Sequence, residues 1–125
     1  MSLGRVWVEP TPIASTNTPA QTAVSDTEGL ILAANLARKE VIIQNTGTTT
    51  LKLSFGTTAP TQTVYHIALK GCSAANDGSG GVFIESGWIG PIRAISSAAG
   101  GTCVILEKKV GDPAWGPSGA WGNNQ

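Results

Sequence analysis

The stretch RKEVIIQNTGTTTLKLSFG, residues 38–56, decides the fold class of this chain. Three consecutive β-branched residues begin the run at 41–44, and such side chains favour a pleated, half-buried strand. In residues 51–55 apolar side chains alternate with polar ones, which is the period of a strand with one buried face. Between the two runs, Asn45 and Gly47 are residue types that accept the positive φ angles of tight turns. The stretch therefore predicts a β-hairpin with one face on a hydrophobic core.

The rest of the chain repeats this pattern of short apolar runs separated by Gly, Pro and Asn. Strands are expected at residues 22–24, 29–32, 40–44, 51–55, 64–69, 81–85, 92–96 and 103–108. One short segment, residues 32–38, is rich in Ala and Leu and would also suit a helical turn. Short strands at this spacing indicate an all-β protein, a single antiparallel β-sandwich with a jelly-roll-like arrangement. We expect the sandwich at residues 22–109, between an extended N-terminal arm (residues 1–21) and a C-terminal arm (residues 110–125).

Alternation within the strands also predicts which side chains form the core. The most ambiguous strand is 40–44, because three β-branched residues in a row do not reveal its inward face. Trp88 is expected in the core or at a strand end. The predicted core consists of Val41, Ile43, Leu51, Leu53, Phe55, Ile67, Leu69, Phe83, Ile95, Val104 and Leu106.

Length and charge restrict the possible functions. A chain of 125 residues forms one domain with one core. Eight Lys plus Arg balance eight Asp plus Glu without a basic stripe, so we expect no nucleic-acid partner. No apolar run reaches the roughly 18 residues that span a membrane, and the first residues do not resemble a secretory signal. These features predict synthesis in the cytoplasm and no membrane partner.

The residues that could carry chemistry are few and scattered. The run Asn-Asp-Gly-Ser-Gly-Gly at 76–81 superficially resembles a serine-protease motif, but its order differs and His66 is the only histidine. A glycine-rich turn is the better interpretation, and calcium binding at Asp77 is a weak alternative. Cys72 and Cys103 could form one disulfide, although in the cytoplasm we expect two free thiols. We therefore predict no catalytic residues, no cofactor and no metal site.

The two ends of the chain carry three of its four tryptophans. Trp7 precedes a proline-rich stretch, and Trp115 and Trp121 lie in two Ala-Trp-Gly units within uncharged sequence rich in Gly and Pro. Aromatic anchors often supply much of the binding energy of an interface. We predict that these three residues contact a partner; the alternative, that they cover their own sandwich, is nearly as good.

Two long segments resemble a known group of proteins. They are LILAANLARKEVIIQNTGTTTLKLSFG (residues 30–56) and GCSAANDGSGGVFIESGWIGPIRAISSAAGGTCVILE (residues 71–107). In both, the order of strands and turns is similar to that of small β-sandwich proteins of tailed-bacteriophage virions, in particular capsid decoration, or cement, proteins with jelly-roll-like folds. The resemblance covers roughly residues 29–108 and leaves out both arms.

The resemblance implies a structural protein that binds the outside of the phage head and stabilises contacts between major capsid subunits. Its implied partners are the major capsid protein and itself, as a dimer or trimer on the shell, and its implied location is the capsid exterior. The same module also occurs in fibres and tails, so a fibre, tail or receptor- and glycan-binding component is the alternative. A carbohydrate-binding module or glycan-active enzyme is a third possibility, because β-sandwiches host both.

Overall fold

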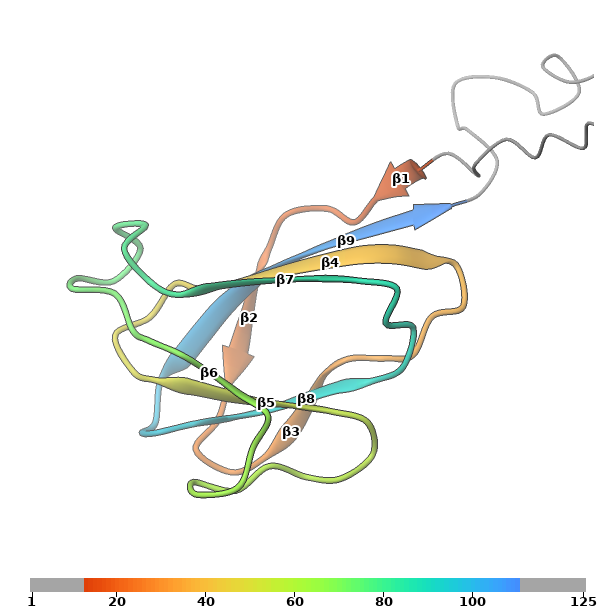
Figure 1. The fold of residues 1–125 in the computed structure, drawn as a ribbon. Coiled ribbons are helices and arrows are strands. Elements are labelled where there is room, and N and C mark those ends of the chain that lie inside the picture. The colour runs from red at the N-terminus through yellow and green to blue at the C-terminus, as the bar shows by residue number, and fades with distance from the viewer. Residues whose placement is uncertain (1–12, 111–125) are drawn as a thin grey trace, which may run out of the picture.

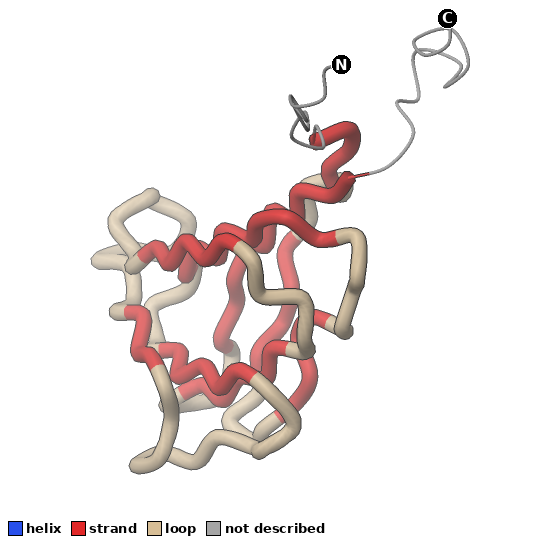
Figure 2. Tube along the Cα trace, turned by 45° about the vertical axis from the view of Figure 1, so that its right-hand side comes forward, coloured by secondary structure: helices blue, strands red, loops and turns tan. Residues whose placement is uncertain are grey.

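The structure is a computed structural model that describes residues 13–110. Strands joined by loops account for all the regular structure of this part of the chain, which contains no helix and hence no membrane-spanning one (Figures 1 and 2). The strands are β1 (Ile13–Thr16), β2 (Gln21–Val24), β3 (Gly29–Leu32), β4 (Arg38–Asn45), β5 (Leu51–Phe55), β6 (Ile67–Leu69), β7 (Val82–Ser86), β8 (Ile92–Ser96) and β9 (Gly101–Val110).

The strands form two antiparallel sheets that pack face to face (Figure 1). Sheet A has the order β1-β9-β4-β7, with β2 also paired to β9, and sheet B has the order β3-β8-β5-β6. The pairs β5–β6, β4–β7, β3–β8 and β2–β9 are nested one inside the next. A long two-stranded ribbon has thus been rolled up until β9 also meets β4 and β8 also meets β5. This is a jelly roll, and it confirms the predicted all-β sandwich.

The core lies between the two sheets and follows the period-two pattern of the strands. In β4 and β5 the alternate residues Val41, Ile43, Leu51 and Leu53 are completely buried, as the sequence predicted. Half-buried aromatic and aliphatic side chains pack against the edge of this cluster. The fully assembled core comprises Val24, Val41, Ile43, Leu51, Leu53, Leu69, Ile92, Ala94, Cys103 and Ile105, with Ile31, Leu32, Phe55, Ile67, Phe83 and Trp88 beside it.

The predicted hairpin between residues 41–44 and 51–55 is wrong. β4 belongs to sheet A and β5 to sheet B, so residues 46–50 carry the chain from one layer to the other. Asn45 directs this crossing: its buried side chain donates to the carbonyls of Thr49 and Leu69 and accepts from the Gly47 N–H. Neither Asn45 nor Gly47 has a positive φ. Space at Gly47 is tight instead, because a Cβ there would lie 3.0 Å from the Thr102 hydroxyl oxygen and 3.2 Å from the Thr102 backbone nitrogen, so that Thr102 would have to shift.

Two further predictions differ from the structure. In β9 the buried apolar side chains are Cys103 and Ile105, whereas Val104 and Leu106 lie on the outer face of sheet A, so the predicted register was wrong by one residue. Ile95 is buried, but on the face of β8 opposite the main core.

The segment at 32–38 forms a turn rather than a helical turn. The side chain and carbonyl of Asn35 accept the N–H groups of Ala37 and Arg38 and so close this turn. Such local side-chain bonds compete with helix formation.

The first described residues add a strand that the sequence did not predict. β1 pairs with the end of β9, with Ile13 opposite Val110, inside the region expected to be an extended arm. Asn17 then ties the chain to β9, because its side chain accepts the Glu107 N–H and donates to the Ile105 carbonyl. The first and last described residues, Ile13 and Val110, therefore lie side by side at the end of β9 (Figure 1).

Candidate functional site

A buried arginine organises the end of the sandwich at which the described chain begins and ends. The side chain of Arg38, the first residue of β4, has no exposed surface, and its Nε lies 2.8 Å from a carboxylate oxygen of Glu107 on β9. Its other nitrogens donate to the carbonyls of Ala33 at 2.5 Å, Gly90 at 2.8 Å and Trp88 at 3.1 Å. A buried charge is tolerated when it is paired and fully hydrogen-bonded. One side chain therefore holds together two loops that are far apart in sequence, residues 33–37 and 87–91.

The same two loops hold large apolar side chains out in solvent. Leu36 is 88% exposed and Ile89 is 40% exposed. They border a hollow of about 640 Å³, whose other walls come from residues 38–40 of β4 and from Ser86 and Gly87 at the end of β7. Because Arg38 fixes both loops, Leu36 and Ile89 are presented on a rigid frame. We call this feature the loop hollow.

A second recess opens between the two sheets on the other side of the 87–91 loop. It has a volume of about 270 Å³ and is walled mainly by aromatic rings, and we call it the aromatic cleft. The ring of Phe55 lies 5.2 Å from Phe83 and 6.0 Å from Trp88, centroid to centroid, in tilted and edge-on arrangements that aromatic pairs favour. Its polar groups are the imidazole of His66 and the carboxylate of Glu85.

Each polar group of the aromatic cleft retains a free position. The Nδ1 of His66 accepts the Phe55 N–H, which in the neutral ring leaves the hydrogen on Nε2. Among residues 13–110, Glu85 has neither a hydrogen bond from its side chain nor an ion pair. The aromatic cleft therefore combines apolar walls with one acceptor and one donor, the usual design of a site for a small, mostly apolar group.

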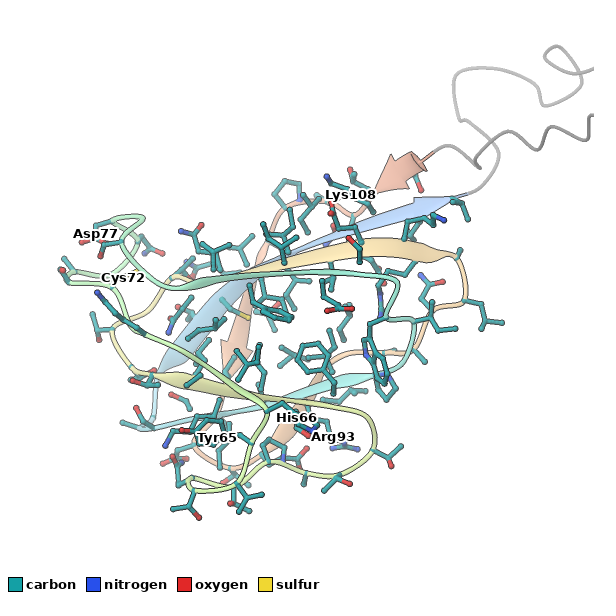
Figure 3. The ribbon with its side chains drawn as sticks, viewed as in Figure 1. Tyr65, His66, Cys72, Asp77, Arg93 and Lys108 are labelled. Atoms are coloured by element: carbon teal, nitrogen blue, oxygen red, sulfur yellow. The ribbon has the colours of Figure 1, made fainter. Side chains whose placement is uncertain are left out.

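The glycine-rich run at 76–81 is a turn closed by hydrogen bonds to one of its own side chains, as the sequence predicted. The Asp77 carboxylate accepts the Ser79 hydroxyl and N–H and the Ala74 N–H. These bonds, led by the one from the Ser79 hydroxyl, lower the pKa of Asp77 to about 2. Figure 3 places His66 and this turn in different parts of the molecule, so imidazole and hydroxyl do not form a catalytic pair.

The two cysteines are free thiols buried in the structure. Cys103 lies in the core, where burial raises its pKa to about 11, so the thiol is protonated and unreactive at neutral pH. Cys72 lies beside the glycine-rich turn and donates to the Asn45 carbonyl. Within the part of the chain that the structure describes, no three His, Cys, Asp or Glu side chains are grouped as metal ligands.

The predicted partner-binding residues Trp7, Trp115 and Trp121 lie outside the described residues. The loop hollow and the aromatic cleft are not predicted by the sequence patterns. The only available signal for the loop hollow was Arg38, a cation at the start of a strongly apolar strand. Leu36 lies in the segment that suits a helical turn by its composition, and an apolar residue in such a turn needs no special explanation.

Comparisons with known proteins do not assign the chain to a family. No family model matches it, and neither does any curated protein. A solved chain from Bacillus endospore appendages, described as "a novel family of disulfide-linked pili", is similar with a TM-score of 0.46 and 17% identity, over 89% of this chain and 100% of that chain. At this identity and TM-score the likeness carries no argument about function.

Proposed function

We propose that this protein is a structural component of a tailed-bacteriophage virion, a decoration protein that binds the outside of the head and stabilises contacts between major capsid subunits. The observation that carries the proposal is the pairing of exposed Leu36 and Ile89 on loops fixed by the buried Arg38. The resemblance of residues 29–108 to decoration proteins supplies the kind of partner.

Rigid presentation of apolar side chains suits binding better than catalysis. Exposed apolar side chains that border a hollow favour association with another surface, and fixed loops reduce the entropy lost when they bind. Beside the loop hollow, Ile13 and Val110 mark where the terminal segments with Trp7, Trp115 and Trp121 begin. In our proposal, this end of the sandwich and the terminal segments together meet the capsid or a neighbouring copy. A protein that binds only the assembled shell stabilises that shell by mass action.

The test is to add the purified protein to heads that lack it. We expect it to sediment with the heads and to raise the temperature at which they release DNA. Leu36→Ser removes an exposed apolar contact that would be buried on binding, and about 1.5–3 kcal/mol for such a side chain corresponds to at least roughly tenfold weaker attachment. The matched control is Leu30→Ser, because Leu30 is also an exposed leucine, at 52%, but lies outside the loop hollow.

The amount of the protein in purified virions distinguishes a head decoration protein from a tail or fibre component. A decoration protein is present at a fixed ratio to the major capsid protein and is absent from isolated tails and fibres. Recovery with tails or fibres alone would exclude head decoration and favour the alternative component. Equal loss of binding in the Leu36 and Leu30 variants would exclude the loop hollow as the contact.

A further inference from the structure

We propose that the free edge of β7 and the aromatic cleft beside it form one binding site for an extended segment of another protein. The segment adds to sheet A as a further strand next to β7, and one of its lysine or arginine side chains enters the cleft and pairs with Glu85. This site includes neither Leu36 nor Ile89, so the proposal and the proposed function can each fail without the other.

The first observation is that β7 is the most open edge of the sandwich. It pairs only with β4, and sheet A has no strand beyond it in the described part of the chain (Figure 1). Its pairing is regular over five residues. The other edge strands have three or four residues, and the pairing of β1 and β3 is interrupted by register shifts. β7 also lacks proline and lysine, with which proteins often block an edge.

The second observation is that alternate backbone groups of β7 point away from β4. Just before β7 begins, the Asn45 N–H donates to the Gly81 carbonyl. Just after it ends, the Gly87 N–H donates to the Lys39 carbonyl. Bonded and unbonded pairs alternate along antiparallel strands, so β7 bonds to β4 through residues 83 and 85. The N–H and C=O groups that face the open edge, where an added strand would bond, are those of Val82, Ile84 and Ser86.

The third observation is an unpaired charge beside this edge. Phe83 and Glu85 are the inward-facing residues of β7, and both line the aromatic cleft. Glu85 is half-buried, yet within residues 13–110 its carboxylate has no ion pair and no hydrogen bond. In a strand added to β7, the residue opposite Glu85 lies on the same face of the sheet and points into the same cleft. A basic side chain at that position pairs with the carboxylate.

The walls of the cleft suit the whole of a basic side chain and not only its charge. Lysine and arginine have apolar stems, and a cation near the face of an aromatic ring is attracted to it. The cleft supplies the rings of Phe55, Phe83 and Trp88 together with the Glu85 carboxylate. Its volume of about 270 Å³ is below the roughly 300–1,000 Å³ of sites for drug-sized ligands. It therefore suits one side chain of a larger partner.

Glu85 also argues against a second copy of β7 as the added strand. In an antiparallel pair of β7 strands, both Glu85 carboxylates would lie on one face of the joined sheet, and an inward-pointing charge is a common defence against such pairing. A strand with a basic residue at this position gains an ion pair instead. Val82 and Ile84, each more than half exposed on the other face, favour apolar neighbours there. The partner segment is thus basic on one face and apolar on the other.

The experiment titrates the full chain with a capped peptide, Thr-Thr-Lys-Val-Thr-Val-Thr, and follows the backbone amides by NMR. In antiparallel register the lysine lies opposite Glu85, and the two valines lie opposite Ile84 and Val82. We expect the amide resonances of Val82, Ile84 and Ser86 to move most. Glu85→Gln should weaken binding by about fivefold, the upper end for a partly exposed ion pair. Leu36→Ser should leave the affinity unchanged.

Two exchanges test the charge pair and the backbone bonds separately. Glu85→Lys should reverse the preference, so that this variant binds the peptide with glutamate in place of lysine more tightly than the original. Methylation of the first valine nitrogen, which would donate to the Ile84 carbonyl, should greatly weaken binding. Methylation of the next threonine nitrogen, which points away from β7, is the matched control and should have a smaller effect.

The proposal is wrong if the peptide at millimolar concentration leaves the β7 amides unchanged, or if both methylated peptides bind equally well. It is also wrong if Glu85→Lys still prefers the lysine peptide, or if Leu36→Ser abolishes binding. Amide spectra of each variant alone show that it remains folded. Dimerisation of the protein without peptide, with shifts at the same β7 amides, would assign the edge to a second copy and overturn the proposal.

Discussion

Replacement of Arg38 by methionine should be among the most damaging single changes in this protein. Methionine keeps an unbranched side chain of similar length but cannot donate hydrogen bonds. The change leaves the Glu107 carboxylate, only 10% exposed, without its cation, and it removes the donors to the carbonyls of Ala33, Trp88 and Gly90. Removing one partner of a buried ion pair typically costs about 3–5 kcal/mol.

This cost is large compared with the stability of a small domain. Domains of this kind are stable by about 5–15 kcal/mol, and each kcal/mol shifts the midpoint of a domain of roughly 100 residues by about 4–8 °C. Arg38→Met should therefore lower the thermal midpoint by roughly 12–40 °C. Adding Glu107→Leu should recover part of the loss, because the pair is then replaced by apolar side chains and no charge stays buried.

The assay is thermal unfolding followed by circular dichroism, combined with hydrogen exchange of the loop amides. Exchange at Ala37, Asn35 and Gly87 should accelerate more than exchange in β5, since Arg38 holds the two loops. The matched control is Lys108→Met, which breaks the ion pair between Lys108 and Glu40 on the outer face of sheet A, where exposed pairs add little. If Arg38→Met melts at the same temperature as Lys108→Met, Arg38 does not organise this end of the sandwich.

Three further predictions concern other parts of the molecule. Ile105→Ala should cost about 2–5 kcal/mol in chemical denaturation, and Val104→Ala clearly less, since only Ile105 faces the core; equal costs would contradict the observed register. Ser79→Ala should raise the pKa of Asp77 in an NMR titration. In the unmodified protein, the stabilisation from Asp77 is complete above the ordinary carboxyl pKa and is lost as the pH falls toward 2, because its folded-state pKa is lowered; an unchanged pKa in the variant would refute the role of Ser79. Cys103 should react with a thiol reagent at pH 8 only after unfolding, and rapid labelling of the native protein would contradict its burial.

The sequence predicted the layers better than the connections between them. Alternation in residues 51–55 identified a half-buried strand and its inward face, and the structure confirms both. Alternation does not identify the neighbouring strand, so β4 and β5 were paired with each other although they face one another across the core. Asn45 and Gly47 did not resolve this ambiguity, because the same residue types occur in a hairpin turn and in a loop that crosses between sheets.

The errors at β9 and at the loop hollow have different physical causes. In β9, Cys103, Val104, Ile105 and Leu106 form a continuous apolar run, and such a run does not show which alternate residues face inward. The loop hollow depends on Arg38, whose acceptors at 33, 88, 90 and 107 are brought together only by the folded chain. A constellation of this kind leaves no spacing pattern in the sequence.

The nested pairing of strands also determines when this chain can fold during its synthesis. The final described strand, β9, lies inside sheet A and is the only neighbour that joins β1 and β2 to β4. Gln21 of β2 pairs with Val104, and Ile13 of β1 pairs with Val110. Strands β1 and β2 therefore gain their partner only after nearly the whole described chain has been translated. Contacts this distant in sequence slow folding and leave strand edges open in the meantime. A copy that is terminated before β9 therefore lacks the strand that closes sheet A, and its open strand edges leave it accessible to proteases.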